Sequence, residues 1–200
     1  MADKADYDQA RENVIDFTGN LLKLLHKIDP GIDDALDPKK SVMRIYRDIR
    51  FSKNKTPYKN NFGISIPTMG LRNGGVEYYL HLTPGASFIA GGYWMPEAGH
   101  LKAIRQEIDY NAHDLKKVID DPGFIKLFGD FRKQEKLKTV PKGYEADNEN
   151  MELLKLKSFI VSHPIKDKDL FKAGAEEHIA MVCTKLHPLN VFFKECTCLT

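Results

Sequence analysis

The sequence lacks the patterns that mark membrane, secreted and disulfide-stapled proteins. No stretch approaches the roughly 18 consecutive apolar residues of a membrane span. The polar, acidic start does not match a secretory signal, which needs a basic end followed by an apolar stretch. Only three cysteines occur in 200 residues, all from position 183 onward, so a disulfide framework is not expected. These absences predict a cytoplasmic protein with no membrane association.

Familiar catalytic and cofactor-binding motifs are missing as well. The chain has no glycine loop of the P-loop or dinucleotide type, no H-E-x-x-H zinc motif and no G-x-S-x-G nucleophile elbow. Its seven histidines are scattered without the spacing of metal ligands, and Cys196 and Cys198 offer two ligands where a zinc site needs four. The sequence therefore predicts no metal and no cofactor, and it leaves open whether the protein is an enzyme.

Composition and hydrophobic spacing indicate a single α+β domain, with a mostly antiparallel sheet packed by N-terminal and C-terminal helices. A chain of this length can bury about 70% of its unfolded surface. We predict a helix over residues 5–28, a basic strand and loop over 42–60, a β-meander over 62–94, helices over 97–131, a late strand over 154–163, and helices over 168–196.

Local patterns support these elements. Apolar residues recur at intervals of three and four from Tyr7 to Ile28, which is typical of a core-facing helix, with a short coiled-coil seam as the alternative. The pair Gly91-Gly92 predicts a bulge or close approach by another group, and the neighbouring Trp94 is expected either beside a functional face or in the core. Pro188 is expected to break the C-terminal helix.

Positive charge is concentrated in one segment. Residues 39–59 contain eight basic residues and one acid, a net charge of +7 in a chain whose total is +2. Such an island in an otherwise acidic chain indicates a local anion site. Apolar and charged residues alternate from Arg44 to Phe51, which predicts a strand, although the spacing of three between the arginines also fits a helix face.

The candidate anion-binding residues share a positive charge or a phenol group. They are Arg44, Arg47, Arg50, Lys53, Lys55, Tyr58 and Lys157. Arginine presents a planar fork of donors that matches carboxylate or phosphate, and Lys157 would join the site if Lys155 and Lys157 share a face of the late strand. Asp48, Tyr79 and His81 are candidates for orienting the arginines or for acid–base chemistry.

We therefore expect a protein of unknown function that binds a phosphorylated or carboxylated small molecule in a basic pocket, with or without turnover. The alternative is a module that binds single-stranded nucleic acid or protein, because aromatic residues interleave with the basic ones, namely Tyr46, Phe51, Tyr58 and Phe62. A structural ion-pair network of the arginines also fits the pattern. The sequence does not determine the oligomeric state.

Several short motifs resemble one known family. Residues 44–51 read R-x-x-R-D-x-R-F, and residues 78–85 read Y-Y-x-H-x-x-P-G. A G-G-x-x-x-P pattern covers 91–96, and P-K-G-Y at 141–144 and L-K-S-F at 156–159 follow. Over about residues 7–192 the chain resembles the family catalogued as domain of unknown function 2461. Members usually carry an additional N-terminal segment with a Trp-Phe pair, so no role of that pair is carried over. The resemblance implies no activity.

Overall fold

The computed structural model describes residues 2–47, 50, 55–68, 75–133 and 136–198, and within these ranges it contains one four-stranded antiparallel sheet. The strands are β1 (Phe62–Pro67), β2 (Val76–Leu82), β3 (Ser87–Tyr93) and β4 (Phe159–Ile165), hydrogen-bonded in the order β1-β2-β3-β4. The first three strands form the predicted meander, and β4 joins it from much later in the chain.

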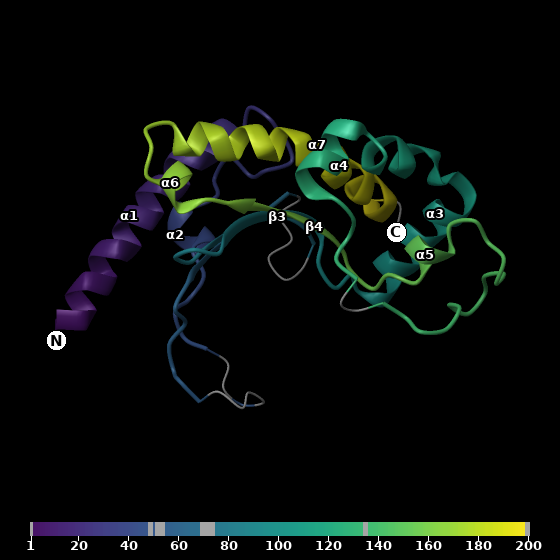
Figure 1. Ribbon diagram of the computed structural model, residues 1–200, viewed down its shortest axis with the longest axis horizontal. Coiled ribbons are helices and arrows are strands. Elements are labelled where there is room, and N and C mark those ends of the chain that lie inside the picture. The colour runs from purple at the N-terminus through teal and green to yellow at the C-terminus, as the bar shows by residue number, and fades with distance from the viewer. Residues whose placement is uncertain (1, 48–49, 51–54, 69–74, 134–135, 199–200) are drawn as a thin grey trace.

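Helices cover one face of the sheet (Figure 1). The helices of the described ranges are α1 (Ala2–Leu25), α2 (Pro38–Ser41), α3 (Ala98–Ile119), α4 (Pro122–Phe128), α5 (Met151–Leu154), α6 (Asp167–Leu170) and α7 (Ala175–Cys198). Helix α7 packs on β3 and β2, and α1 and α3 pack against α7. The predicted α+β class, with terminal helices on an antiparallel sheet, is confirmed.

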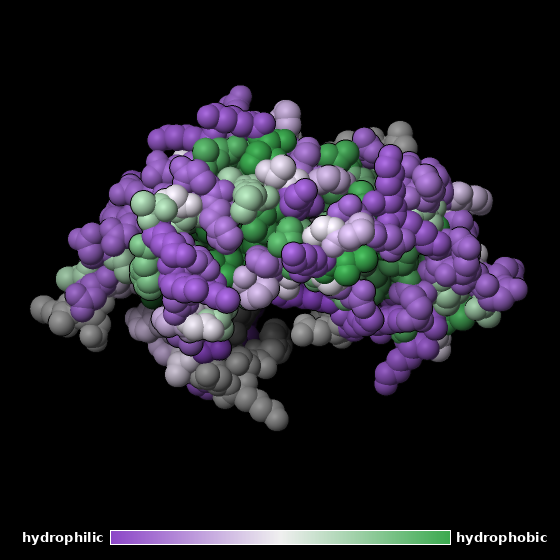
Figure 2. All heavy atoms as spheres, turned by 45° about the horizontal axis from the view of Figure 1, so that its top comes forward, coloured by the Kyte–Doolittle hydropathy of each residue, from purple (hydrophilic) through white to green (hydrophobic). Residues whose placement is uncertain are grey.

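The helix-covered side is largely hydrophilic at its surface, with hydrophobic residues visible between the polar ones (Figure 2). Within the ranges described above, no helix is long and apolar enough to cross a membrane.

The side chains of β2 alternate between the two faces of the sheet. Tyr78 and Leu80 are buried toward the helices, whereas Glu77, Tyr79 and His81 are only partly buried on the other face. This period of two is what an antiparallel sheet with one covered face requires. It confirms that Tyr79 and His81 share one face of the strand.

The basic segment is not the strand that its alternation predicts. In its described part, only two isolated bridges occur, between Val42 and Ile64 and between Tyr46 and Tyr58. The segment folds back on residues 55–60 and leaves the edge of β1 (Figure 1). Most side chains of this two-stranded excursion are exposed, so no buried face stabilises a longer ladder.

The predicted late strand also begins later than expected. Residues 151–154 form helix α5, and Lys155 and Lys157 lie in the connection before β4, so the prediction that they share a strand face is wrong. The reason is a tertiary contact. Arg105 of α3 donates from Nε to the Leu154 carbonyl at 2.8 Å and from Nη2 to the Leu156 carbonyl at 3.2 Å. Because these carbonyls already accept hydrogen bonds from Arg105, they need no hydrogen bond from a neighbouring strand.

Pro188 does not break α7, which runs on to Cys198. A proline inside a helix costs about 3 kcal/mol because it removes a hydrogen bond and crowds the preceding turn. The packing of α7 against the sheet, α1 and α3 compensates for this loss of free energy. The expected break is therefore overridden by packing.

The two central glycines of β3 are approached by the protein itself. A Cβ on Gly91 would lie 3.0 Å from Cδ1 of Leu186 in α7. Gly92 has φ of 113°, and a Cβ there would lie 2.0 Å from the carbonyl oxygen of Phe159 in β4. Its N–H donates to Oδ1 of Asn190 at 2.9 Å. The predicted close approach is real, and it is made by α7 and β4.

A buried carboxylate joins the turn after α1 to β2 and α7. Asp29 is fully buried, and one oxygen accepts from Nζ of Lys194 at 2.7 Å. Its other oxygen lies 3.1 Å from the Tyr78 hydroxyl and 3.3 Å from Nδ1 of His187. Burial alone would raise the pKa of Asp29, but the hydrogen bonds from Lys194 and from the Gly31 N–H outweigh it, and the pKa is lowered.

Replacing Lys194 by Met should lower the free energy of unfolding by about 3 kcal/mol at neutral pH, because Asp29 would stay buried without its cation. Lys185→Met, at an exposed position on the same helix, should change it by less than about 0.5 kcal/mol. Urea unfolding followed by circular dichroism measures both.

The effect should depend on pH in one direction. Because the folded-state pKa of Asp29 is lowered, its stabilisation is present above about pH 4 and is lost as the pH falls further. The difference between the parent and Lys194→Met should therefore shrink in acid. A difference independent of pH would show that only the lysine stem matters.

Candidate functional site

The sheet face turned away from α7 has a floor of small side chains. Antiparallel register places its residues in three rows across the strands, each given from β1 to β4: Pro67, Glu77, Gly92, Ile160; Ser65, Tyr79, Ala90, Ser162; and Gly63, His81, Phe88, Pro164. Glycine, alanine and serine in these rows leave space that larger neighbours surround. The register thus builds a hollow on this face.

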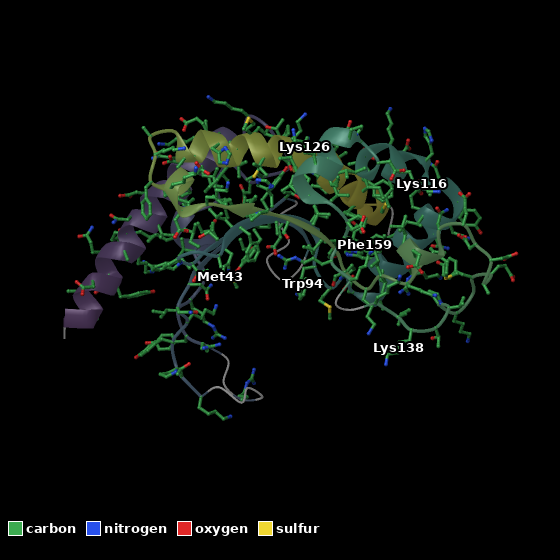
Figure 3. All side chains as sticks on the ribbon, in the orientation of Figure 1. Met43, Trp94, Lys116, Lys126, Lys138 and Phe159 are labelled. Carbon is green, nitrogen blue, oxygen red and sulfur yellow. The ribbon has the colours of Figure 1, made fainter. Side chains whose placement is uncertain are left out.

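A cavity of about 440 Å³ occupies this hollow. Glu77, Tyr79 and Phe88 line it from the sheet, while Met43, Trp94 and Arg132 line it from outside the strands. Met43 and Trp94 lie on the side of the sheet opposite to α7 (Figure 3). Trp94 is 46% exposed, so its expected alternative place in the core is wrong.

Arg132 supplies positive charge to the cavity. Its N–H donates to the Ile160 carbonyl at 2.8 Å, and its Nε donates to Oγ of Ser162 at 3.3 Å. The guanidinium carbon lies 4.8 Å from the centre of the Phe88 ring, in cation–π geometry. Among the described residues, no carboxylate forms an ion pair with Arg132. The guanidinium is thus held in place without an opposite charge from the described residues.

His81 lies beside this charge. Its ring stacks on Phe88, with centroids 4.8 Å apart, and its Nδ1 lies 3.1 Å from the Tyr79 hydroxyl and 3.4 Å from Nδ2 of Asn61. Burial, then the charge of Arg132, then the charge of Lys59 lower the pKa of His81. His81 is therefore neutral at physiological pH. Because both neighbours can donate to Nδ1, its proton lies on Nε2.

Glu77 supplies negative charge at the other side of the cavity. Its carboxylate accepts a hydrogen bond from Oγ of Ser65 on β1. Burial raises the pKa of Glu77, and the Ser65 hydrogen bond only partly offsets this. Tyr79, two residues along the strand, is also affected by burial and by the Glu77 charge, which raise its pKa, while Arg132 lowers it. Tyr79 therefore lies within electrostatic range of both charges.

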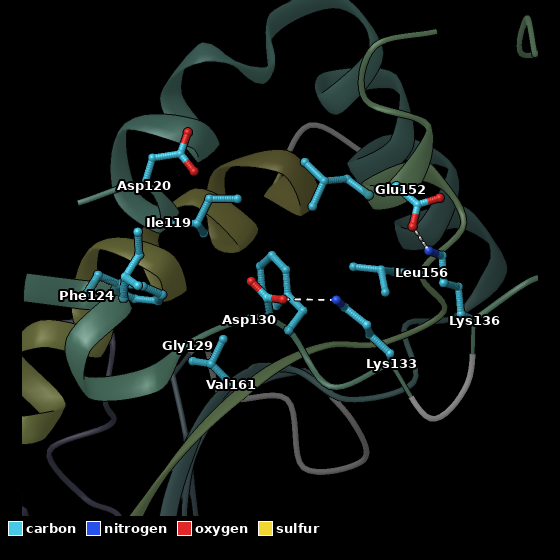
Figure 4. Close-up of a pocket in the computed structure, with 13 residues that line it drawn as sticks. Ile119, Asp120, Phe124, Gly129, Asp130, Lys133, Lys136, Glu152, Leu156 and Val161 are labelled. Carbon is cyan, nitrogen blue, oxygen red and sulfur yellow. Dashed lines mark hydrogen bonds and ion pairs between the residues drawn. The ribbon is translucent and has the colours of Figure 1, made fainter. Parts of the chain in front are cut away.

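A second cavity, of about 320 Å³, lies beside α4 and α5 (Figure 4). Its two lysines are already paired: Nζ of Lys133 lies 2.9 Å from Asp130, and Lys136 forms an ion pair with Glu152. A ligand would have to break these pairs to use their charge. The cavity on the sheet face is therefore the better candidate site.

The arginine segment lies away from the sheet, on an arm that we define as residues 42–47 and 55–60. Arg44 is exposed, and Arg47 donates from Nη1 to Oγ1 of Thr56 at 3.0 Å. The rings of Tyr46 and Tyr58 lie 5.6 Å apart, and both side chains are more than half exposed. The arm contacts the cavity through Met43.

The other predicted site residues are dispersed. Arg50 and Lys55 are exposed near the outer part of the arm, while Asp48 and Lys53 lie outside the described residues. Lys157 precedes β4, at the edge of the sheet opposite to β1, so the sheet separates it from the arm. Among the candidates that the structure describes, Tyr79 lines the cavity and His81 lies next to it, with its Nδ1 3.1 Å from the Tyr79 hydroxyl.

The cysteines whose side chains the structure describes, Cys183 and Cys196, are both buried. Burial raises the pKa of Cys196 to about 12 and that of Cys183 still further, so neither thiol ionises readily. Throughout the described ranges, no group of three histidine, cysteine, aspartate or glutamate side chains is arranged to hold a metal ion.

A sequence profile described as "Conserved hypothetical protein (DUF2461)" matches residues 1–192. The chain belongs to this family. No curated protein and no solved structure matches the chain significantly. The family that the motifs indicate is thus confirmed, and its description names no activity, so the function of this DUF2461 protein has to be inferred from the site.

Sequence reasoning missed the two charges that define the cavity. Glu77 could have been found, because it alternates with Tyr79 and His81 and so must share their face. Arg132 carries no such signal. It follows α4 in an irregular segment and reaches the cavity only through its contacts with β4 and Phe88.

In this DUF2461 protein, Arg132→Met should raise the pKa of His81, because one of the charges that disfavours its protonation is removed. Lys59→Met should raise it less, and Lys138→Met, at an exposed position after α4, should leave it unchanged. Titration of the ring protons by NMR measures this. If the pKa of His81 is the same in Arg132→Met as in the parent, the proposed proximity of the two groups is wrong.

Proposed function

We propose that the cavity on the sheet face binds a small organic molecule through a carboxylate or phosphate group. The observation that carries this proposal is the Arg132 guanidinium, which lines the cavity and has no ion-pair partner among the residues described. Leaving such a charge unneutralised in a partly buried place is unfavourable unless an anion joins it.

Arg132 is also preorganised for this role. Ser162 accepts a hydrogen bond from its Nε, and its guanidinium lies over the Phe88 ring. The two terminal nitrogens, Nη1 and Nη2, make no hydrogen bond to the described residues. Two parallel N–H groups match the two oxygens of a carboxylate or phosphate. Because the side chain is already ordered, less conformational entropy is lost on binding.

The remaining walls suit the organic part of a ligand. Met43, Phe88, Trp94 and Ile160 present sulfur, aromatic and aliphatic surface. A cavity of about 440 Å³ falls in the usual range for small-molecule sites, which are mostly apolar with a few placed polar groups. His81 lies next to this lining, with its Nδ1 3.1 Å from the hydroxyl of Tyr79, which does line the cavity. This proposal relocates the expected anion site from the arm to the sheet.

Binding of para-toluate and phenyl phosphate, measured by calorimetry at constant ionic strength, tests the proposal. Arg132→Met should weaken binding at least about tenfold, which corresponds to about 1.4 kcal/mol. Arg132→Lys keeps the charge but loses the planar fork, so it should recover only part of the affinity. Arg44→Met, at an exposed position on the arm, is the matched control and should have little effect.

Two outcomes would contradict the proposal. One is an affinity unchanged by Arg132→Met although the variant melts like the parent. The other is a loss on Arg44→Met as large as the loss on Arg132→Met, which would return the anion site to the arm.

A second candidate function is binding of single-stranded nucleic acid by the arm. The observation that favours it is the exposed pair of Tyr46 and Tyr58 among basic residues, because bases stack on tyrosine rings while the phosphates pair with cations. Such binding would not need the cavity.

Fluorescence anisotropy with a labelled single-stranded oligonucleotide measures this binding. Tyr58→Ala should weaken it about tenfold, since a stacked base contributes about 1–3 kcal/mol. Tyr110→Ala removes a tyrosine that is 84% exposed on α3 and serves as the control. Equal, small effects of the two changes would rule out the arm as a stacking surface.

A further inference from the structure

The cavity has two charged ends that do not neutralise each other. Arg132 and Lys59 lie around His81 at one end, and Glu77 lies toward the other. In the described part of the chain, Glu77 and Arg132 form no ion pair with each other or with any other side chain. Elsewhere the protein pairs its enclosed charges, as Asp29 and Lys194 show.

Strand register explains why these charges stay apart. Arg132 is anchored to Ser162 on β4, while Glu77 lies on β2, two strands and one row away. At ordinary strand and residue spacings, the Cα atoms of Glu77 and Ser162 are roughly 12 Å apart. The floor between them is made by Ala90 and Gly92, which cannot carry charge across the gap.

Among the described residues, little compensates the charge of Glu77. It is largely enclosed, and the hydroxyl of Ser65 is its one hydrogen-bond donor among the described groups. A neutral hydroxyl stabilises a carboxylate far less than an ammonium group does. A carboxylate held this way lowers stability when it is ionised, which is common for groups kept for binding or chemistry.

We infer that the ligand is dipolar, with its anionic group on Arg132, a protonated nitrogen on Glu77, and an apolar or aromatic body between them. This inference rests on the proposed function, because it uses Arg132 as the anion site. It adds a selectivity that anion binding alone does not have. Because Arg132 and Glu77 lie at opposite ends of the cavity, the anionic group and the protonated nitrogen must lie at opposite ends of the ligand.

The body of such a ligand has a defined place. Ala90 lies under the path between the two charged ends, Phe88 lies at the Arg132 end, and Met43 and Trp94 border the path from the arm and from the end of β3. These side chains are apolar, so a ring or a short hydrocarbon chain would be buried there. Burial of that body would supply affinity, and the two end charges would set its orientation.

Three matched probes test the inference by calorimetry: para-aminomethylbenzoate carries both charges on one ring, para-toluate carries only the anion, and benzylamine carries only the cation. The dipolar probe should bind the parent about tenfold more tightly than para-toluate. Glu77→Gln should abolish this advantage and leave para-toluate binding unchanged. Glu12→Gln, at an exposed carboxylate on α1, should preserve the advantage.

The fold of the variant can be checked independently. Since the amide of Gln can still accept from Ser65, Glu77→Gln should fold. Burial raises the folded-state pKa of Glu77, so the group favours folding at low pH and disfavours it as the pH rises through that pKa. Glu77→Gln should therefore melt no lower than the parent at pH 7.

The outcomes separate the two proposals. If para-toluate and para-aminomethylbenzoate bind equally well, and both depend on Arg132, the dipolar inference is wrong and the anion site stands. If the advantage of the dipolar probe survives Glu77→Gln, the nitrogen does not bind Glu77 and the inference is wrong. If neither carboxylate probe depends on Arg132, both proposals fail.

Discussion

Helix α7 lies on the middle of the sheet where Gly91 has no side chain, and this contact decides which side of each strand is buried. A larger residue at Gly91 would meet Leu186, and one at Gly92 would meet the backbone of β4. Side chains alternate between the two faces along each strand. Because α7 covers one face, the polar side chains lie on the opposite face. The position of the cavity therefore follows from the packing of a helix that does not line it.

Charged side chains have different partners on the two faces of the sheet. On the covered face, Asp29 is matched by Lys194 and held further by Tyr78 and His187, so its charge contributes to stability. On the other face, Arg132 and Glu77 each contact a serine hydroxyl, and no described residue supplies either of them with an opposite charge. A buried charge is stabilised by an opposite charge nearby, which Lys194 provides for Asp29. At Arg132 and Glu77, a ligand of opposite charge would provide this stabilisation.

The arm and the cavity are connected, although they are not one site. The family motif rich in arginine begins directly after Met43, whose side chain borders the cavity. A change in the arm can therefore alter the wall of the cavity without any arginine touching the ligand. This link gives the arm a part in either candidate function, as a wall of the cavity or as a separate surface for nucleic acid.

The sequence by itself determined the elements whose signals are local. Alternation in residues 76–82 placed Tyr79 and His81 on one face, and apolar spacing placed the first helix, because both patterns depend only on backbone periodicity. The basic segment was assigned wrongly because it has no buried face, and the late strand was started too early because Arg105 binds the carbonyls of residues 154 and 156. Only the tertiary structure decided the site. Arg132 and Glu77 meet in one cavity because β4 pairs with β3 across a long stretch of chain, and no local pattern encodes that pairing.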